Sequence, residues 1–218
     1  LSGLVFARRS RLAPALAALM GGVALFVSNL NWLDPQITPL VPVLKSYWLM
    51  IHVSVVTASY GFFGICAACG IASLAATAFG RNLRELRAIN EMAMIVGLAL
   101  LTAGIFFGAV WANESWGRYW GWDPKETWAL ITMFAYALAT HSRHIPRLDG
   151  PFAFDVLSVV CFSTVLMTFF GVNYYLSGLH SYGHSGGVSL TVPLIGASVV
   201  IALIAAAAGR YFKTSKKR

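Results

Sequence analysis

The feature that most constrains the fold of this chain is a series of apolar runs, each about twenty residues long. A helix of that length crosses a hydrocarbon core of roughly 30 Å. The 218 residues are 58% hydrophobic and only 11% charged, whereas a soluble domain carries about 25% charged residues. The runs also lack the apolar and polar alternation of transmembrane β-strands. We therefore predict an all-α integral membrane protein.

The apolar runs predict a bundle of about six transmembrane helices in a single polytopic domain that covers residues 1–218. The second run is longer than one perpendicular crossing needs, which predicts a tilt or a projection beyond the bilayer. No linker, internal repeat or low-complexity stretch marks a second domain. The expected spans are about 12–29, 47–78, 90–111, 125–142, 153–176 and 189–209.

Basic residues in the connections predict the orientation of the bundle. Of the 16 Lys and Arg residues, all but Lys45, Arg118 and Lys125 lie at one set of helix ends. We expect those basic ends, with both termini, in the cytoplasm, or in the stroma of an organelle. Loops of about 30–46, 112–124 and 177–188 then face outward. The net charge of +8 is explained by topology and lipid headgroups, and we expect no nucleic-acid partner.

The second outward loop belongs to a tryptophan-rich segment, residues 111–128, which holds five of the seven tryptophans. Tryptophan is common at membrane interfaces, because its ring is apolar and its N–H prefers water. A belt of this kind spreads over all helix ends, however, whereas Trp116, Tyr119, Trp120 and Trp122 fall within one loop. The cluster is thus also typical of a platform for a flat apolar ligand, and both interpretations remain open.

The end of this loop carries a helix start signal. Asp123 is a preferred N-cap residue, Pro124 suits the first helical position, and Glu126 follows the cap by three residues, as a capping box requires. Asp123 is therefore a candidate for capping as well as for ligand contact.

Two of the five histidines are expected at one depth beside the tryptophans. His52 lies about five residues inside the second span, and His180 lies just past the outer end of the fifth. Such residues are commonly buried hydrogen-bonding groups, yet ionisable residues within spans are also functional candidates. A pair at one depth fits axial coordination of haem iron by neutral imidazole. Arg118 and Lys125 would then contact haem propionates, or otherwise lipid headgroups.

The cysteines of the second span are interpreted as small residues that pack in the core. Cys66 and Cys69 have redox-motif spacing but lie deep in the second span, where a thiolate is poorly stabilised. Gly70 stands where a covalent haem-attachment motif needs histidine.

The segment 116–132 resembles the tryptophan-rich WWD signature of the haem-handling proteins of cytochrome c maturation. Its Trp-Asp-Pro-Lys-Glu-Thr-Trp sequence is similar to the CcsA (ResC) branch of the system II cytochrome c synthase. His52, His141 in Ala-Thr-His-Ser-Arg and His180 in Gly-Leu-His-Ser-Tyr also match. The resemblance covers roughly residues 45–185, with the WWD segment at about 111–132.

The resemblance implies that haem b is bound, with His52 and His180 as outward axial ligands and His141 as a ligand at an inner site. It also implies a CcsB (ResB) membrane partner, which supplies the second histidine of the inner site. The bacterial inner membrane is the expected location, with the active loop on the periplasmic side, and the thylakoid membrane is the alternative. The implied haem platform comprises Trp116, Arg118, Tyr119, Trp120, Trp122, Asp123 and Lys125.

The implied function is haem delivery followed by covalent attachment to an apocytochrome c that carries Cys-x-x-Cys-His, as in a holocytochrome c synthase. No side chain is a candidate general acid or base, so proximity and control of iron ligation are the expected contributions. Two alternatives remain: a bis-His b-type cytochrome that transfers electrons, and a structural or transport subunit without haem. Family members are often longer than 218 residues, so the chain either lacks an N-terminal portion or is a compact member.

Overall fold

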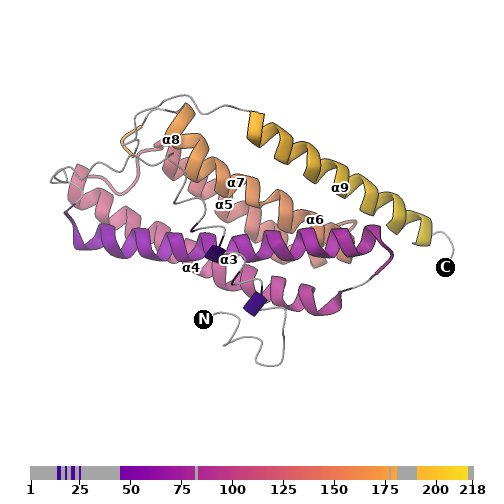
Figure 1. Ribbon diagram of the computed structural model, residues 1–218. Helices are drawn as coiled ribbons and strands as arrows, with labels where there is room; N and C mark the ends of the chain where they lie inside the picture. The colour runs from indigo at the N-terminus through magenta and orange to yellow at the C-terminus, as the bar shows by residue number, and fades with distance from the viewer. Residues whose placement is uncertain are drawn as a thin grey trace.

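The computed structural model describes residues 45–81, 83–176, 178–180 and 191–215, together with single positions between 14 and 25. The described residues form helices and connecting loops, with no strand among them (Figure 1). Twelve of the 18 residues of the expected span at 12–29 lie outside the described residues, so its prediction is not tested. The helical elements are α3 (Tyr47–Ala78), α4 (Arg84–Trp116), α5 (Pro124–His141), η2 (Ser142–His144), α6 (Pro151–Val160), α7 (Phe162–Leu166), η3 (Met167–Gly171), α8 (Val172–Tyr175) and α9 (Thr191–Ser215).

Four segments of the described chain are long and apolar enough to cross a membrane. They are Tyr47–Ala78, Glu85–Trp116, Pro151–Tyr175 and Pro193–Thr214. Helix α5 has 18 residues and packs against its neighbours in the same bundle. At about 1.5 Å per residue it has nearly the length of a hydrocarbon core. The prediction of an all-α, multi-pass membrane protein is confirmed.

Helices α3 and α4 form a long antiparallel pair whose close approach depends on glycine. A Cβ at Gly97 would lie 2.8 Å from the Phe63 ring, and one at Gly104 would lie 2.5 Å from Cγ2 of Val56. Small residues allow this approach in membrane helices, where packing rather than water drives association. Gly104 and Gly108 are spaced one helical turn apart and face α3 at the level of His52.

The main core lies among α3, α4, α5 and α7. The rings of Phe63 and Tyr136 stack at its centre with centroids 3.6 Å apart. Cys66 and Cys69 are buried free thiols, which confirms their prediction as packing residues, and Cys161 is buried in the same core.

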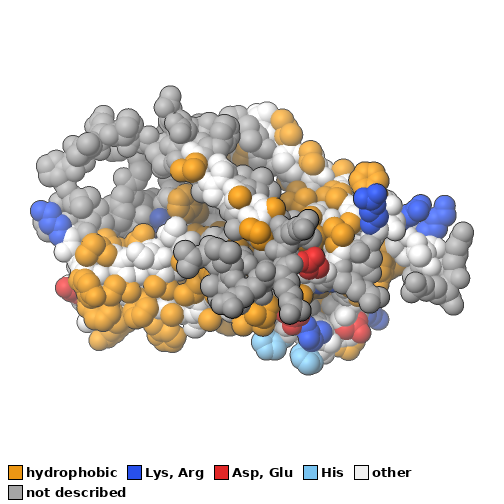
Figure 2. Space-filling model, turned by 60° about the horizontal axis from the view of Figure 1, so that its bottom comes forward, with side chains coloured by type: hydrophobic (Ala, Val, Ile, Leu, Met, Phe, Trp, Pro, Cys, Tyr) orange, Lys and Arg blue, Asp and Glu red, His pale blue; other side chains and the backbone are white. Residues whose placement is uncertain are grey.

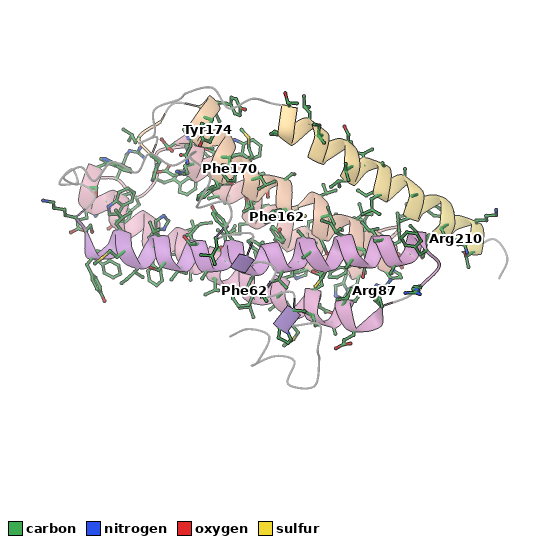
Figure 3. The ribbon with its side chains drawn as sticks, in the orientation of Figure 1. Phe62, Arg87, Phe162, Phe170, Tyr174 and Arg210 are labelled. Carbon is green, nitrogen blue, oxygen red and sulfur yellow. The ribbon has the colours of Figure 1, made fainter. Side chains whose placement is uncertain are left out.

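Helix α9 joins the bundle mainly through its C-terminal half. Ala207 is buried against Leu74 and Val159, and the ring of Tyr211 stacks on Phe152 at 5.2 Å. The Thr191 end of α9 leans away from α8 (Figure 1). Arg87 and Arg210 lie toward the same end of the bundle, opposite the end where α3 begins and α4 finishes (Figure 3).

The fifth expected span is one helical rod with a local irregularity. It runs from Pro151 to Tyr175, and residues 167–171 form a π-helical turn. The hydroxyl of Thr168 donates to the Thr164 carbonyl at 2.7 Å and lies 3.1 Å from the Thr132 hydroxyl on α5. Single π turns widen a helix locally and are frequent at functional sites.

Candidate ligand site at the tryptophan end of the bundle

The tryptophan-rich segment is divided between a helix and a loop. Helix α4 continues to Trp116, and it ends where Gly117 adopts φ of 69°, a left-handed conformation that favours glycine. The expected loop from 112 is therefore wrong for its first five residues. The sequence between 111 and 116 contains no glycine or proline, so nothing local interrupts the helix.

Trp111, which was not among the predicted site residues, is buried near the end of α4. Its side chain is 1% exposed and contacts both candidate histidines. The ring stacks on His52 at 6.3 Å and meets the edge of His180 at 5.4 Å. Trp116 lies 4.7 Å from Trp111 and 4.9 Å from His180. The signal for Trp111 was its position at the end of an uninterrupted apolar run.

His52 lies in the second turn of α3 and points toward α4. Its Nδ1 is 2.7 Å from the Gly104 carbonyl oxygen. A carbonyl can only accept, so Nδ1 carries the proton and Nε2 holds the lone pair in the neutral ring. A Cβ at Gly108 would lie 2.6 Å from Cε1 of His52. The missing side chain at 108 is thus what makes room for the imidazole.

Asp123 has two structural roles at the start of α5. It is the N-cap of a complete capping box, with Lys125 N donating to Oδ1 at 3.0 Å and the Glu126 side chain returning to the Asp123 N–H. This confirms the predicted helix start. The same carboxylate accepts a hydrogen bond from Nδ1 of His180 at 3.0 Å and another from the backbone N–H of Leu179 at 2.7 Å. Asp123 is only 6% exposed, so these contacts are protected from water.

His180 is therefore oriented in the same sense as His52. Its Nδ1 faces a carboxylate, which leaves the lone pair of the neutral ring on Nε2. Burial lowers the pKa of His180 from the ordinary 6.5, while the Asp123 charge acts in the opposite direction. The neutral form that binds metals is thus the form favoured by burial. Gly178 permits this approach, since a Cβ there would contact Oδ2 of Asp123.

Both histidines line one cavity of about 290 Å³ between α3, α4, α5 and η3. Pockets for small ligands and cofactors typically range from about 300 to 1,000 Å³ and are mostly apolar. The wall is aromatic and aliphatic, with few polar groups. Other residues that line it include Tyr60, Trp111, Tyr119, Trp120, Lys125 and Phe169.

The two cations of this region differ in their surroundings. Lys125 lines the cavity, and its Nζ donates to the neutral Asn173 amide oxygen at 2.8 Å. Arg118 lies outside the cavity wall, 3.5 Å from a Glu126 oxygen and with its guanidinium 5.8 Å from the Trp116 ring. Gly121 leaves room for that guanidinium, which a Cβ at 121 would contact. Lys125 is thus the cation that faces the cavity.

The remaining predicted platform residues take different places. Trp120 lines the cavity and packs edge to face on Trp122 at 5.7 Å, while Trp122 itself is 70% exposed. Trp116 and Asp123 do not line the cavity; both contact the His180 ring. The structure thus brings His52, His180, Tyr119, Trp120 and Lys125 to one space.

His141 lies at the opposite end of α5 from Asp123. Its Nδ1 is 2.8 Å from the Ala137 carbonyl oxygen, and the side chain is exposed. His144 is also exposed in the following turn, and His184 lies outside the described residues. Figure 2 shows the exposed histidines on one face beside acidic and basic side chains. His141 is therefore separate from the His52–His180 cavity.

Sequence comparison identifies relatives of this chain. The family described as cytochrome c assembly protein matches residues 2–180. The chain is 50% identical over 190 residues to the protein NrfI of Wolinella succinogenes, covering 84% of this chain and 21% of that protein. It is 40% identical over 156 residues to the cytochrome c biogenesis protein CcsA of Chlamydomonas reinhardtii, covering 68% of this chain and 44% of the relative. The CcsA protein of Guillardia theta is 37% identical, with 77% and 66% covered.

Proposed function

This chain belongs to the cytochrome c assembly protein family and is of the CcsA type, and from that premise we propose that it binds haem b in the His52–His180 cavity and presents it for covalent attachment to apocytochrome c. The chain spans between a fifth and two thirds of the length of these relatives. The activity of the whole assembly is therefore part of the proposal.

One observation carries the proposal: His52 and His180 line the same cavity, and each has its Nδ1 bound to an acceptor. Each imidazole therefore offers Nε2 to a ligand, and second contacts of this kind hold metal-binding histidines in place. In the described part of the chain, no group of three His, Cys, Asp or Glu residues could hold a bare metal ion. Two imidazoles suit an iron whose other four ligands come from a porphyrin.

The cavity wall supports haem as the bound group. Trp111, Trp120 and Tyr119 supply aromatic surface for a flat ring. Lys125 is the cation of the wall, and we assign it to a propionate. Trp116, Arg118, Trp122 and Asp123 complete the platform by supporting these contacts.

The chemistry of attachment is an addition that needs no side-chain acid or base. A histidine of the substrate Cys-x-x-Cys-His segment replaces one protein imidazole on the iron. Each cysteine thiol then adds across a haem vinyl group, so that a carbon–sulfur bond forms and the thiol hydrogen passes to the vinyl carbon. The contribution of the chain is proximity and orientation, which are worth several kcal/mol in bringing reactants together.

The remaining assignments follow from the same proposal. His141 binds haem at an inner site, where a CcsB (ResB) partner supplies the other ligand. The cavity faces the periplasm from the bacterial inner membrane. The basic residues at the far end of the bundle support this orientation.

Coexpression tests the proposal. The chain and a CcsB partner are produced with an apocytochrome c in a host without its own cytochrome c maturation system, and covalent haem is measured on the cytochrome after denaturation. We expect covalent haem with the chain and a loss of most of it in His52→Ala and His180→Ala. Bound haem without any attachment, despite the partner, would instead support an electron-carrying b-type cytochrome. Purified chain without haem would contradict the proposal.

A further inference from the structure

The two candidate iron ligands differ in what holds their second nitrogen. Nδ1 of His180 faces the buried carboxylate of Asp123 at 3.0 Å. Nδ1 of His52 faces the backbone carbonyl of Gly104 at 2.7 Å. The first acceptor carries a negative charge, whereas the second is neutral.

We propose that the two imidazoles are unequal ligands: His180 remains on the iron, and His52 is the ligand that gives way to the incoming histidine of the substrate. This inference rests on the proposed haem function and adds the identity of the exchanged ligand. Asp123 is a positioning residue in this scheme, because it acts on the iron through His180.

The charge of the acceptor decides which ligand is stronger. A carboxylate draws the Nδ1 proton toward itself and so raises the electron density and basicity at Nε2. Hydrogen bonds to an ionised group are roughly twice as strong as those between neutral groups. The Gly104 carbonyl is also inside helix α4, where it already accepts the N–H four residues later. His52 therefore shares its neutral acceptor with a backbone N–H of the helix. Its Nε2 is the weaker electron-pair donor to the iron.

The surroundings of Asp123 also hold His180 in place. Oδ1 accepts the Lys125 N–H, and Oδ2 accepts the Leu179 N–H from the residue next to His180. One carboxylate therefore fixes both the imidazole and the backbone that carries it. The ring therefore cannot swing away from the iron without losing its Asp123 acceptor, and the backbone that carries it is held by the same carboxylate.

The exchange step is balanced without a further reactant. The bond between iron and Nε2 of His52 breaks, and a bond between iron and the substrate imidazole forms. His52 keeps its Nδ1 proton, and the oxidation state of the iron does not change.

Haem transfer from the purified full chain to an excess of apomyoglobin tests the inference. We expect His180→Ala to release haem at least about tenfold faster than His52→Ala, the low end of the effect of second contacts on metal affinity. The optical spectrum of each variant before transfer shows whether a nitrogen ligand has been lost. Equal release rates, or faster release from His52→Ala, would overturn the inference.

Asp123→Asn separates the charge from the shape of the side chain. Asparagine is as good an N-cap as aspartate, so α5 should still begin at Pro124. We expect a more positive midpoint potential of the bound haem and faster release, because His180 becomes a weaker donor. The control is Asp149→Asn, which neutralises an exposed carboxylate that does not line the cavity and should leave the midpoint potential unchanged.

The outcomes separate this inference from the proposed function. If neither histidine variant changes the haem content or the spectrum, the haem site itself is wrongly placed. If both lose a ligand but Asp123→Asn has the same midpoint potential as the parent chain and Asp149→Asn, the proposed inequality is wrong while the haem site stands. If His180→Ala does not accumulate in the membrane, the midpoint potential of the haem in Asp123→Asn tests the inequality of the two ligands instead.

Discussion

Asp123 and His180 are 57 positions apart in the sequence, and a hydrogen bond of 3.0 Å joins Oδ1 of the first to Nδ1 of the second. The same carboxylate begins helix α5 by accepting the Lys125 N–H. The start of a helix and the orientation of a candidate iron ligand therefore depend on one side chain. This arrangement predicts that stability and ligand binding respond together to changes at 123.

Removing the Asp123 carboxylate should destabilise the protein. In Asp123→Ala, α5 loses its N-cap, at a cost of about 0.5–2 kcal/mol, and the buried Nδ1 of His180 loses its acceptor. We expect the free energy of unfolding in detergent to fall by about 2 kcal/mol, measured by denaturant titration with circular dichroism.

The matched control for this prediction is Asp149→Ala, which removes a carboxylate from an exposed turn. Exposed substitutions usually change stability by less than about 0.5 kcal/mol. If the two variants had equal stability, Asp123 would not have the structural role described above.

Adding one methyl group at Gly108 should displace His52. The new Cβ would lie 2.6 Å from Cε1 and 2.7 Å from Nδ1 of the imidazole, so the ring must turn away from its Gly104 acceptor. We expect Gly108→Ala to accumulate in the membrane but to lose the optical signature of two nitrogen ligands. Overpacking of this kind costs about 1–3 kcal/mol, which corresponds to haem retention lower by about tenfold or more.

Gly61→Ala is the control, because a Cβ at that position in α3 meets nothing within 4 Å. It also replaces a glycine within a helix, where alanine has the better helix propensity. We expect its haem content and spectrum to match those of the unchanged chain. A normal spectrum in Gly108→Ala as well would show that His52 does not need this space to act as a ligand.

Trp116→Leu with Trp120→Leu distinguishes a ligand platform from an interfacial belt. Leucine keeps much of the apolar area, so a belt should tolerate the change. Aromatic contacts contribute about 0.5–1.5 kcal/mol each beyond burial, and two lost contacts predict haem retention lower by about tenfold. Haem content at matched protein levels is the measurement.

Trp122→Leu is the comparison within the same loop. Its side chain is 70% exposed and does not line the cavity. We expect a smaller effect on haem content than in the double variant. Normal haem content in both variants would identify these tryptophans as interfacial anchors.

His141→Ala should lower haem loading without changing the ligands at the His52–His180 cavity. His141 lies at the opposite end of the 18-residue helix α5, about 25 Å away by helical rise. The prediction is checked by haem content and by the spectrum of the haem that remains. His144→Ala removes a neighbouring exposed histidine and is expected to be silent. A change in the spectrum that reports the axial ligands in His141→Ala would show that His141 and the His52–His180 cavity belong to one haem site.

Several features of the protein were accessible from local sequence patterns. The long apolar runs predicted α3 with both its ends, and the Asp-Pro-Lys-Glu sequence predicted the start of α5 to within one residue. These signals are strong because a helix forms, and is capped, through contacts between residues at most four positions apart.

The predicted end of the third span was wrong for a related reason. Hydropathy falls after Trp111, because Asn113, Glu114 and Ser115 are polar, so the apolar run ends before the helix does. The backbone, however, needs a conformational signal to stop, and Gly117 supplies it. The helix therefore carries Trp116, which was predicted in the loop, on the same rigid element as Trp111.

Local sequence patterns were enough to predict a helical, membrane-spanning chain with histidines beside tryptophans at one end. The contacts of the folded bundle could not be predicted in this way: Trp111 touches the rings of both His52 and His180, Gly108 leaves room for His52, and Asp123 binds His180. Such contacts join residues more than fifty positions apart, and they depend on how far each helix is rotated about its axis. That rotation is set by the sum of many small packing energies across the bundle, which no local pattern records.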